Sequence, residues 1–201
     1  MDTRPTDTSP TRLTVFQTAI GWCGLAWSDR GLVGAQLPEG DGDQTRRRLG
    51  RRFAQATETA PSPVIQPVVD AIVRLTAGDR VDLTFARLDL DAVPAFNQAV
   101  YALACAIPPG ETRTYGDLAV DLGDRNLARA VGKALGENPI PIVVPCHRVL
   151  GAGARIGGFS ARGGAATKAR LLAIEGARTS AVPTLFDDAD TFSIAPPTRR
   201  P

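Results

Sequence analysis

One run in the C-terminal half limits what this chain can fold into. Residues 138–149 read NPIPIVVPCHRV and place three prolines around a short apolar stretch. Proline has no backbone N–H to donate and keeps the residue before it out of the helical region. The run therefore predicts a stiff, mostly buried connector that delivers Cys146 to a fixed place.

Cys146 is followed by His147, which is the only histidine of the chain. A thiolate is the reactive form of cysteine, and at an ordinary pKa of about 8.5 only a few per cent of it is present at neutral pH. A neighbouring base raises that fraction, so the pair fits a nucleophile beside its base. A free cysteine next to an apolar run is equally often a small core residue. These two residues alone leave both interpretations open.

The other cysteines exclude a zinc site of the usual kind. Cys23 and Cys105 form no C-x-x-C pair with each other or with Cys146, and one histidine cannot complete a Cys/His ligand set. We therefore expect no metal. The odd number of cysteines and the lack of a signal peptide predict a reducing cytoplasm. No apolar run approaches the ~18 residues needed to span a bilayer.

The charge distribution favours an anionic partner for one half of the chain. The net charge is only +2, but residues 110–178 carry ten Lys/Arg against six Asp/Glu, whereas residues 1–109 carry eleven against twelve. A modest basic surface suits a polyanion such as nucleic acid. The excess is small enough that an ordinary solvated surface explains it equally well.

The first half predicts a small α+β domain over residues 12–91, after a disordered segment 1–11. Runs separated by turn residues predict an antiparallel meander; they span residues 13–18, 22–27 and 32–37. Helices are predicted over 41–53 and from Pro61 to Gly78. Alternation of Val81, Leu83 and Phe85 predicts one more strand. Five arginines between Arg46 and Arg52 indicate a solvated helix face, with a nucleic-acid patch as the alternative.

The second half, residues 92–177, predicts a mostly helical domain. Apolar spacing predicts helices over 93–107, 114–122, 126–135 and 165–174. The second and third of these, joined by a turn at Gly123, form a helix-turn-helix arrangement, and Arg129 and Lys133 share one face of the third. DNA contact and a plain amphipathic helix both remain open. Residues 178–201 lose all pattern and predict a disordered tail.

The run around Cys146 closely resembles the active-site signature of the O6-alkylguanine-DNA alkyltransferases. The similarity is carried by Asn138-Pro-x-Pro-Ile-x-x-Pro-Cys146-His147-Arg148-Val149. Further segments share the family's pattern, so that residues 94–176 are densely covered: 95–101, 110–119, 128–132, 158–160 and 168–176. The N-terminal domain resembles the family only in its pattern.

The resemblance implies an α+β fold and a repair reaction. The fold has a small N-terminal antiparallel sheet with helices, ribonuclease H-like, before a helical domain that contains the helix-turn-helix. The reaction moves an alkyl group from O6-alkylguanine, and also from O4-alkylthymine, to a cysteine, once per molecule and without cofactor. A duplex hides the O6 atom, so the base must be flipped out. The implied partner is double-stranded DNA, held through the minor groove by a monomeric protein.

The resemblance also implies four catalytic residues. Cys146 is the expected nucleophile, and His147 is the expected base, acting through a bridging water because adjacent residues of a helix do not face each other. Glu175 is expected to orient His147 as the third member of a triad. Asn138 is expected to hold the connector by bonding its backbone groups.

A second set of residues is expected to contact the DNA. Tyr115 lies beside the extruded base in this interpretation, and Arg129 fills the vacated place in the stack. The Val149 carbonyl reads the exocyclic amine of guanine, and the Ser160 amide donates to O6. The remaining expected contacts are Phe159, Arg148 and Lys133. Phe159 stands where many relatives carry tyrosine, and the loop 160–168 is about two residues longer than the common pattern.

Three alternatives compete with alkyl transfer. A protein that binds the lesion without transfer would lack the cysteine, which is present here. A thiol hydrolase that uses Cys146 and His147 would turn over repeatedly on an acyl substrate. A helix-turn-helix regulator would leave Cys146 unmodified by alkylated DNA.

Overall fold

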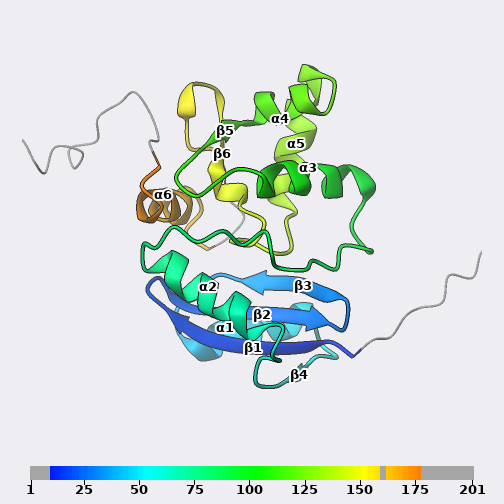
Figure 1. Cartoon of the computed structure of the whole chain (residues 1–201), viewed down its shortest axis with the longest axis vertical. Coiled ribbons are helices and arrows are strands. Elements are labelled where there is room, and N and C mark those ends of the chain that lie inside the picture. Colours follow the sequence, from blue (N-terminus) through cyan, green and yellow to red (C-terminus); the bar gives the residue numbers. More distant parts are fainter. Residues whose placement is uncertain (1–9, 159–161, 178–201) are drawn as a thin grey trace, which may run out of the picture.

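The computed structural model describes residues 10–158 and 162–177. Apart from Pro10 and Thr11, the two ends predicted to be disordered lie outside the described residues. Phe159 and Ser160, two of the expected DNA contacts, also lie outside them. The described residues form a mixed α+β fold, as predicted, with a sheet in one half and mostly helices in the other (Figure 1).

The N-terminal half is built on a four-stranded sheet in the order β3-β2-β1-β4. The predicted meander is confirmed: β1 (Arg12–Thr18), β2 (Gly21–Ser28) and β3 (Gly31–Gln36) pair antiparallel. The short β4 (Thr57–Glu58) joins β1 in parallel. Gly31 has φ +149°, and a Cβ there would lie 2.5 Å from the Arg87 carbonyl oxygen, so this turn requires glycine.

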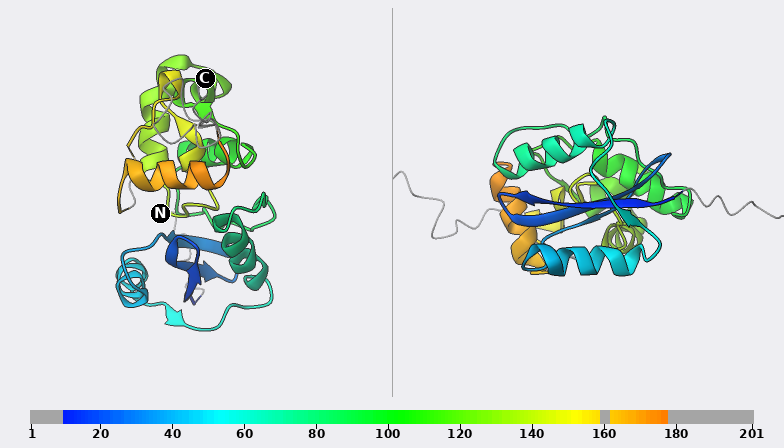
Figure 2. Two further views of the ribbon diagram at one scale, coloured as in Figure 1. Left: turned by 90° about the vertical axis from the view of Figure 1, so that its left-hand side faces the viewer. Right: turned by 90° about the horizontal axis from the view of Figure 1, so that it is seen from below.

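Two helices cover opposite faces of this sheet (Figure 2). Helix α1 (Gly42–Arg52) begins where Asp41 accepts a 2.7 Å hydrogen bond from the Gln44 amide, which is a standard N-cap. Helix α2 (Gln66–Thr76) has proline in its first turn, where the missing N–H costs no hydrogen bond. Its buried stripe, with Val69, Ile72 and Leu75 among its members, packs on the sheet.

The strand predicted at Val81, Leu83 and Phe85 is wrong. Leu83 is buried, but Phe85 is 56% exposed, and the Ala86 amide donates to the Leu83 carbonyl across a turn. The Asp82 side chain accepts a 2.8 Å hydrogen bond from the Thr84 amide. Such local side-chain bonds compete with strand pairing, so an alternating pattern here produces a turn.

The described part of the second half contains the helices α3, α4, α5 and α6, three short 3-10 turns and a two-stranded parallel pair. The helices span Ala95–Cys105 (α3), Tyr115–Asp121 (α4), Ala128–Gly136 (α5) and Ala165–Ile174 (α6). The 3-10 turns span Arg125–Leu127 (η1), Cys146–Arg148 (η2) and Ala152–Ala154 (η3). The strands are β5 (Arg113–Thr114) and β6 (Val149–Leu150).

Two details of the predicted helices need correction. The stretch 126–135 is not one helix, because its first turn is the 3-10 turn η1. The helix predicted from Pro61 to Gly78 is shorter, because α2 spans only Gln66–Thr76. On α3, the hydroxyl of the buried Tyr101 donates to the Ala134 carbonyl of α5 at 2.9 Å and joins these two helices.

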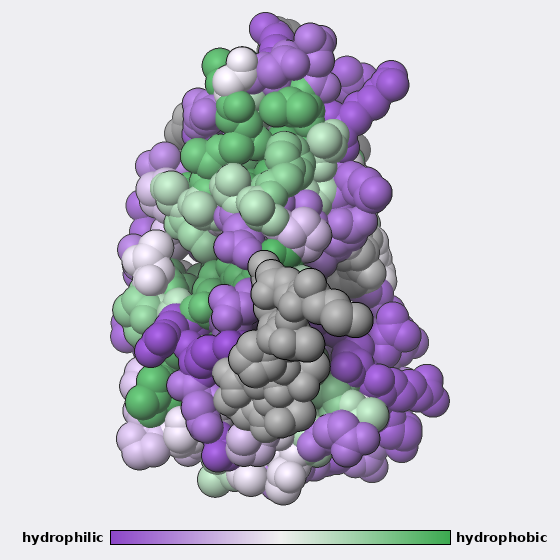
Figure 3. All heavy atoms as spheres, turned by 90° about the vertical axis from the view of Figure 1, so that its right-hand side faces the viewer, coloured by the Kyte–Doolittle hydropathy of each residue, from purple (hydrophilic) through white to green (hydrophobic). Residues whose placement is uncertain are grey.

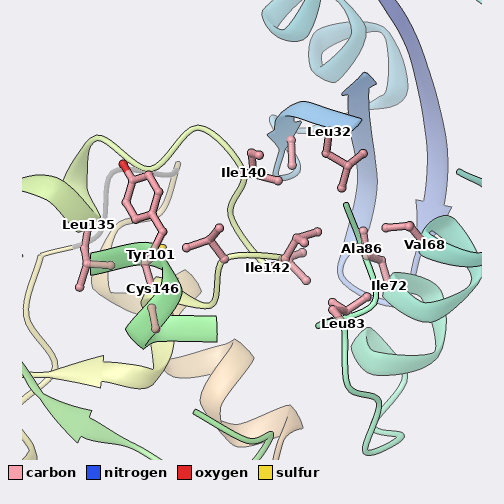
Figure 4. Packing of buried hydrophobic residues seen from close by; sticks show 14 of the residues in the cluster. Leu32, Val68, Ile72, Leu83, Ala86, Tyr101, Leu135, Ile140, Ile142 and Cys146 are labelled. Carbon is pink, nitrogen blue, oxygen red and sulfur yellow. The ribbon is translucent and has the colours of Figure 1, made fainter. Parts of the chain in front are cut away.

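One hydrophobic cluster runs through both halves of the chain. Figure 4 shows Ile140 and Ile142 of the connector between Tyr101 and Cys146 on one side and Leu32 and Val68 on the other. On the molecular face in Figure 3, apolar residues gather over the upper part, which belongs to the C-terminal half. The predicted domain boundary at residues 91 and 92 stays a prediction, because the two halves share this core.

Candidate active site

The connector ends in a buried turn that carries Cys146. Ile140, Ile142, Val143 and Val144 are all buried, as predicted for residues 138–145. Ile142 has φ +75°, an uncommon conformation for a β-branched residue. The Cys146 amide donates to the Val144 carbonyl at 2.8 Å, and the Cys146 side chain is 5% exposed. The thiol is therefore held at a fixed place below the surface.

Asn138 joins the two ends of the connector. Its Oδ1 accepts from the Ile140 amide at 2.9 Å, and its Nδ2 donates to the Val144 carbonyl at 2.9 Å. These bonds to backbone groups agree with the predicted role. Nδ2 also donates to the Cys146 sulfur at 3.2 Å, a contact that the sequence did not indicate. A donor on sulfur favours the thiolate over the thiol.

His147 and Glu175 form a buried pair at 2.9 Å, between Nε2 and Oε1. Burial raises the pKa of Glu175, but hydrogen bonds from His147 and Arg148 outweigh it and bring the pKa down to about 2. Burial also lowers the pKa of His147. A neutral imidazole beside a carboxylate carries its proton on Nε2. Its Nδ1 is then the basic nitrogen, and it has no hydrogen-bond partner among the described residues.

Arg148 was expected to contact DNA, and the structure places it inside the protein instead. Its Nε and Nη2 donate to the two oxygens of Glu175 at 2.9 and 2.8 Å, and its Nη1 donates to the Ile107 carbonyl at 2.6 Å. The side chain is 6% exposed. A bidentate arginine–carboxylate pair is rigid, so Arg148 fixes Glu175 and is not available at the surface.

The sequence did not indicate a role for Lys168 of α6, but the structure places this residue in the site. It is 1% exposed. Its Nζ donates to the Val149 carbonyl at 2.5 Å and to the Tyr115 hydroxyl at 3.3 Å, and it lies 5.5 Å from the centre of the Tyr115 ring. The carbonyl expected to read guanine is thus already in contact with a cation.

Two opposing effects act on the Cys146 sulfur. Burial raises the pKa of the Cys146 thiol, while the Asn138 hydrogen bond and the positive charge of Lys168 lower it, and burial dominates. Burial also lowers the pKa of Lys168, and the nearby sulfur raises it. The resting thiol therefore keeps its proton at neutral pH, and a base must remove it before the sulfur can attack.

Comparison with known proteins matches this site to one family. The family model described as "6-O-methylguanine DNA methyltransferase, DNA binding domain" matches residues 95–177. A methylated-DNA–protein-cysteine methyltransferase of Mycobacterium tuberculosis is 42% identical over 132 residues, 65% of this chain and 78% of that protein. One from Methanothermobacter thermautotrophicus is 31% identical over 153 residues, 76% of this chain and 78% of that protein. The chain belongs to the methylated-DNA–protein-cysteine methyltransferase family.

Solved structures of this methyltransferase family share the fold. The O6-methylguanine methyltransferase of M. tuberculosis has a TM-score of 0.66 at 33% identity, covering 86% of this chain and 96% of that one. The M. tuberculosis OGT in complex with DNA also has a TM-score of 0.66, at 33% identity, covering 85% and 96%. The sequence resemblance to this family is therefore confirmed.

The structure brings together most of the residues that the methyltransferase signature singled out. Asn138 contacts Cys146, Lys168 contacts Tyr115 and acts on the Cys146 sulfur, and His147 pairs with Glu175. Arg129 and Lys133 lie exposed on α5, where Lys133 is 3.9 Å from Glu137. The signal for Lys168 was present in the sequence, because Lys168, Leu171 and Glu175 share one helical face with Leu172.

The described residues show neither a cluster of metal ligands nor a membrane-spanning helix. Within residues 10–158 and 162–177, no three His, Cys, Asp or Glu side chains lie together as a metal ion would require. No helix in the described part of the chain is long and apolar enough to cross a bilayer.

Proposed function

We propose that this chain repairs O6-alkylguanine in DNA by taking the alkyl group onto Cys146, once per molecule. The observation that carries this proposal is the buried sulfur that accepts a hydrogen bond from Asn138, next to a histidine whose partner is an ionised carboxylate. Membership of the methyltransferase family supports it. O4-alkylthymine is a second lesion of the same chemistry.

In the proposed reaction the proton of Cys146 passes to Nδ1 of His147 through a bridging water. Glu175 stabilises the imidazolium that forms. The sulfur then attacks the alkyl carbon opposite O6, so that the S–C bond forms as the C–O6 bond breaks and its electron pair leaves with the guanine. The guanine oxyanion takes up a proton from Tyr115 or water. The product is a thioether, which is a poor leaving group, so the protein acts once.

We propose that the helical half holds the DNA. In this proposal α4 and α5 act as a helix-turn-helix that docks in the minor groove, and Arg129 enters the base stack as the guanine flips out. Lys133 adds a phosphate contact. The Val149 carbonyl and the Ser160 amide read the flipped base, beside Tyr115 and Phe159.

Other expectations belong to the same proposal. The N-terminal half is ribonuclease H-like, the chain acts as a monomer, and it works in the cytoplasm. The three buried or half-buried cysteines are free thiols, which suits a reducing compartment.

A titration of repair against protein tests the proposal. Duplex DNA with one O6-methylguanine is mixed with increasing amounts of protein, and repaired guanine is counted. We expect one mole of guanine to be repaired per mole of protein added, with no further repair after that. Cys146→Ala should bind the duplex without repairing it, whereas Cys105→Ala should repair normally. Repeated turnover would favour a hydrolase, and repair by Cys146→Ala would overturn the proposal.

A further inference from the structure

The connector is attached to the edge of the N-terminal sheet. Strand β3 lies at one edge of the sheet, and its Ala35 amide donates to the Pro139 carbonyl at 2.9 Å. Pro139 directly follows Asn138, the residue that donates to the Cys146 sulfur. The backbone of the N-terminal half therefore holds the chain one residue away from a group that contacts the nucleophile.

Arg52, the last residue of α1, clamps this junction. Its Nη1 donates to the Ala35 carbonyl at 2.8 Å, and its Nη2 donates to the Pro139 carbonyl at 3.0 Å. The guanidinium also lies 5.4 Å from the centre of the Phe53 ring. One planar group thus joins the sheet edge to the connector, with two donors in a fixed geometry that a lysine ammonium does not reproduce.

The other arginines of α1 do not share this geometry. Arg46 pairs with Glu58 at 2.9 Å and with Asp43, both on the N-terminal half. Arg47 and Arg51 are exposed, as Arg52 is, but the hydrogen bonds to Ala35 and Pro139 come from Arg52. Arg51 is therefore a matched control for Arg52, because it is the neighbouring residue of the same type on the same helix.

The conformation of the connector explains why a clamp matters. Ile142 has φ +75° and is buried. A β-branched residue in this region costs on the order of 1–3 kcal/mol, and such a residue persists only where its surroundings hold it. The clamp at Pro139 is one of the contacts that hold the strained connector, together with the Asn138 bonds to Ile140 and Val144.

We propose that Arg52 is a positioning residue for alkyl transfer, acting through Pro139 to keep the Asn138 amide on the Cys146 sulfur. This inference rests on the proposed function. It gives the N-terminal half a part in the reaction, because the clamp joins α1 and β3 to Pro139, the first proline of the connector. Without Arg52 the Pro139 carbonyl keeps only the Ala35 amide, and the Asn138 amide drifts from sulfur.

The test compares Arg52→Met and Arg52→Lys with Arg51→Met. We measure the single-turnover rate of methyl transfer from O6-methylguanine DNA and, separately, the affinity of each protein for that DNA. Arg52→Met should transfer on the order of 10-fold more slowly, because small displacements of reacting groups are costly, with unchanged DNA affinity. Arg52→Lys should be almost as slow, since one ammonium does not bridge both carbonyls. Arg51→Met should match the wild type.

A second readout separates positioning from stability. The rate at which iodoacetamide modifies Cys146 is followed against pH without DNA, by the mass of the Cys146 peptide. In Arg52→Met the profile should move to higher pH, because the donor that favours the thiolate is displaced. Leu13→Val, in the separate cluster of Leu13, Ala26 and Leu49, serves as a variant destabilised elsewhere. Its profile should stay in place.

Two results would overturn the role of Arg52. One is an unchanged transfer rate and pH profile in both Arg52 variants. The other is a transfer rate in Leu13→Val that is as low as in Arg52→Met, when both variants have lost the same amount of melting temperature. A wild-type protein that fails to take methyl from DNA would count against the proposed function instead, while the iodoacetamide profiles still decide whether Arg52 positions Asn138.

Discussion

Glu175 is the residue that ties the catalytic pair to the rest of the protein. It accepts hydrogen bonds from His147 and from Arg148 and is itself 1% exposed on its side chain. The ionised carboxylate fixes which nitrogen of His147 carries the proton and leaves the other free to act as the base. The same residue therefore affects both the stability of the protein and its reactivity.

We expect the free energy of unfolding to depend on pH because of Glu175. Burial raises the pKa of Glu175, but the hydrogen bonds from His147 and Arg148 outweigh burial and bring the pKa from an ordinary 4.5 down to about 2 in the folded protein. A depressed carboxyl pKa contributes stability above the unfolded value, and this contribution of about 3 kcal/mol is lost as the pH falls through the window between them. Urea unfolding from pH 6 to pH 2 measures it.

Glu175→Gln is the matching variant. At neutral pH it should be less stable by roughly 3–5 kcal/mol, because Arg148 is left buried without its partner. The difference in the free energy of unfolding between Glu175→Gln and the wild type should shrink as the pH falls towards 2. Parallel stability curves for the two proteins would contradict the assigned role of Glu175.

His147 should govern the rate of transfer rather than the binding of DNA. Burial lowers its pKa below the ordinary 6.5, so it is a neutral base at neutral pH. His147→Gln should slow single-turnover transfer on the order of 10²-fold or more, with the gap narrowing at high pH as hydroxide removes the thiol proton. A rate equal to that of the wild type at neutral pH would exclude His147 as the base.

At the scale of elements, helix α6 carries part of the site on its buried face. Lys168, Leu171, Leu172 and Glu175 follow helical spacing, and the three residues within the helix are its buried ones. The two leucines pack the helix, and the two charged residues at its ends reach Val149 and His147. Helix α6 therefore fixes the positions of Lys168 and Glu175 relative to Cys146.

Lys168→Met tests the N-terminal part of α6. Methionine fills a similar volume without the charge, so the Val149 carbonyl loses its donor and the Cys146 sulfur loses a neighbouring cation. We expect transfer to fall on the order of 10-fold or more, and the pH profile of Cys146 modification to move to higher pH. Arg170→Met, on the exposed side of α6, should change neither. A wild-type transfer rate and a wild-type pH profile in Lys168→Met would refute the role assigned to Lys168.

The exposed face of α5 tests DNA binding separately from the chemistry. Arg129→Ala should leave the free energy of unfolding within about 0.5 kcal/mol of the wild type, because the side chain lies on the surface. It should still react with iodoacetamide at Cys146 but transfer methyl from DNA more slowly. If iodoacetamide modification and methyl transfer were slowed equally, Arg129 would act on the reactivity of Cys146 itself.

Particular elements show what the sequence could predict. The strands of the meander and α6 were predicted within two residues, because turn glycines and helical spacing mark their ends. The turn at Leu83 was missed, because alternation describes a strand and a turn equally well over five residues. Lys168 could have been found from its spacing. Arg52 could not, because its bonds to Ala35 and Pro139 join residues 17 and 87 positions apart.

At the scale of the whole molecule, the connector links the two halves into one core. Its buried residues belong to a hydrophobic cluster that includes the sheet, α2, α3 and α5. Arg52 and the Ala35 amide attach its beginning to the sheet edge, and Cys146 forms its end. The nucleophile is thus positioned by parts of the chain on both sides of it.

The most direct measurement is the mass of the Cys146 peptide after the protein meets duplex DNA that contains O6-methylguanine. We predict that this peptide gains the mass of one methylene group, that the peptides of Cys23 and Cys105 stay unchanged, and that the DNA contains guanine in equal amount. Burial raises the pKa of each of those two thiols to about 11. An unmodified Cys146 peptide beside unrepaired DNA, or a methyl group on another residue, would contradict alkyl transfer to Cys146.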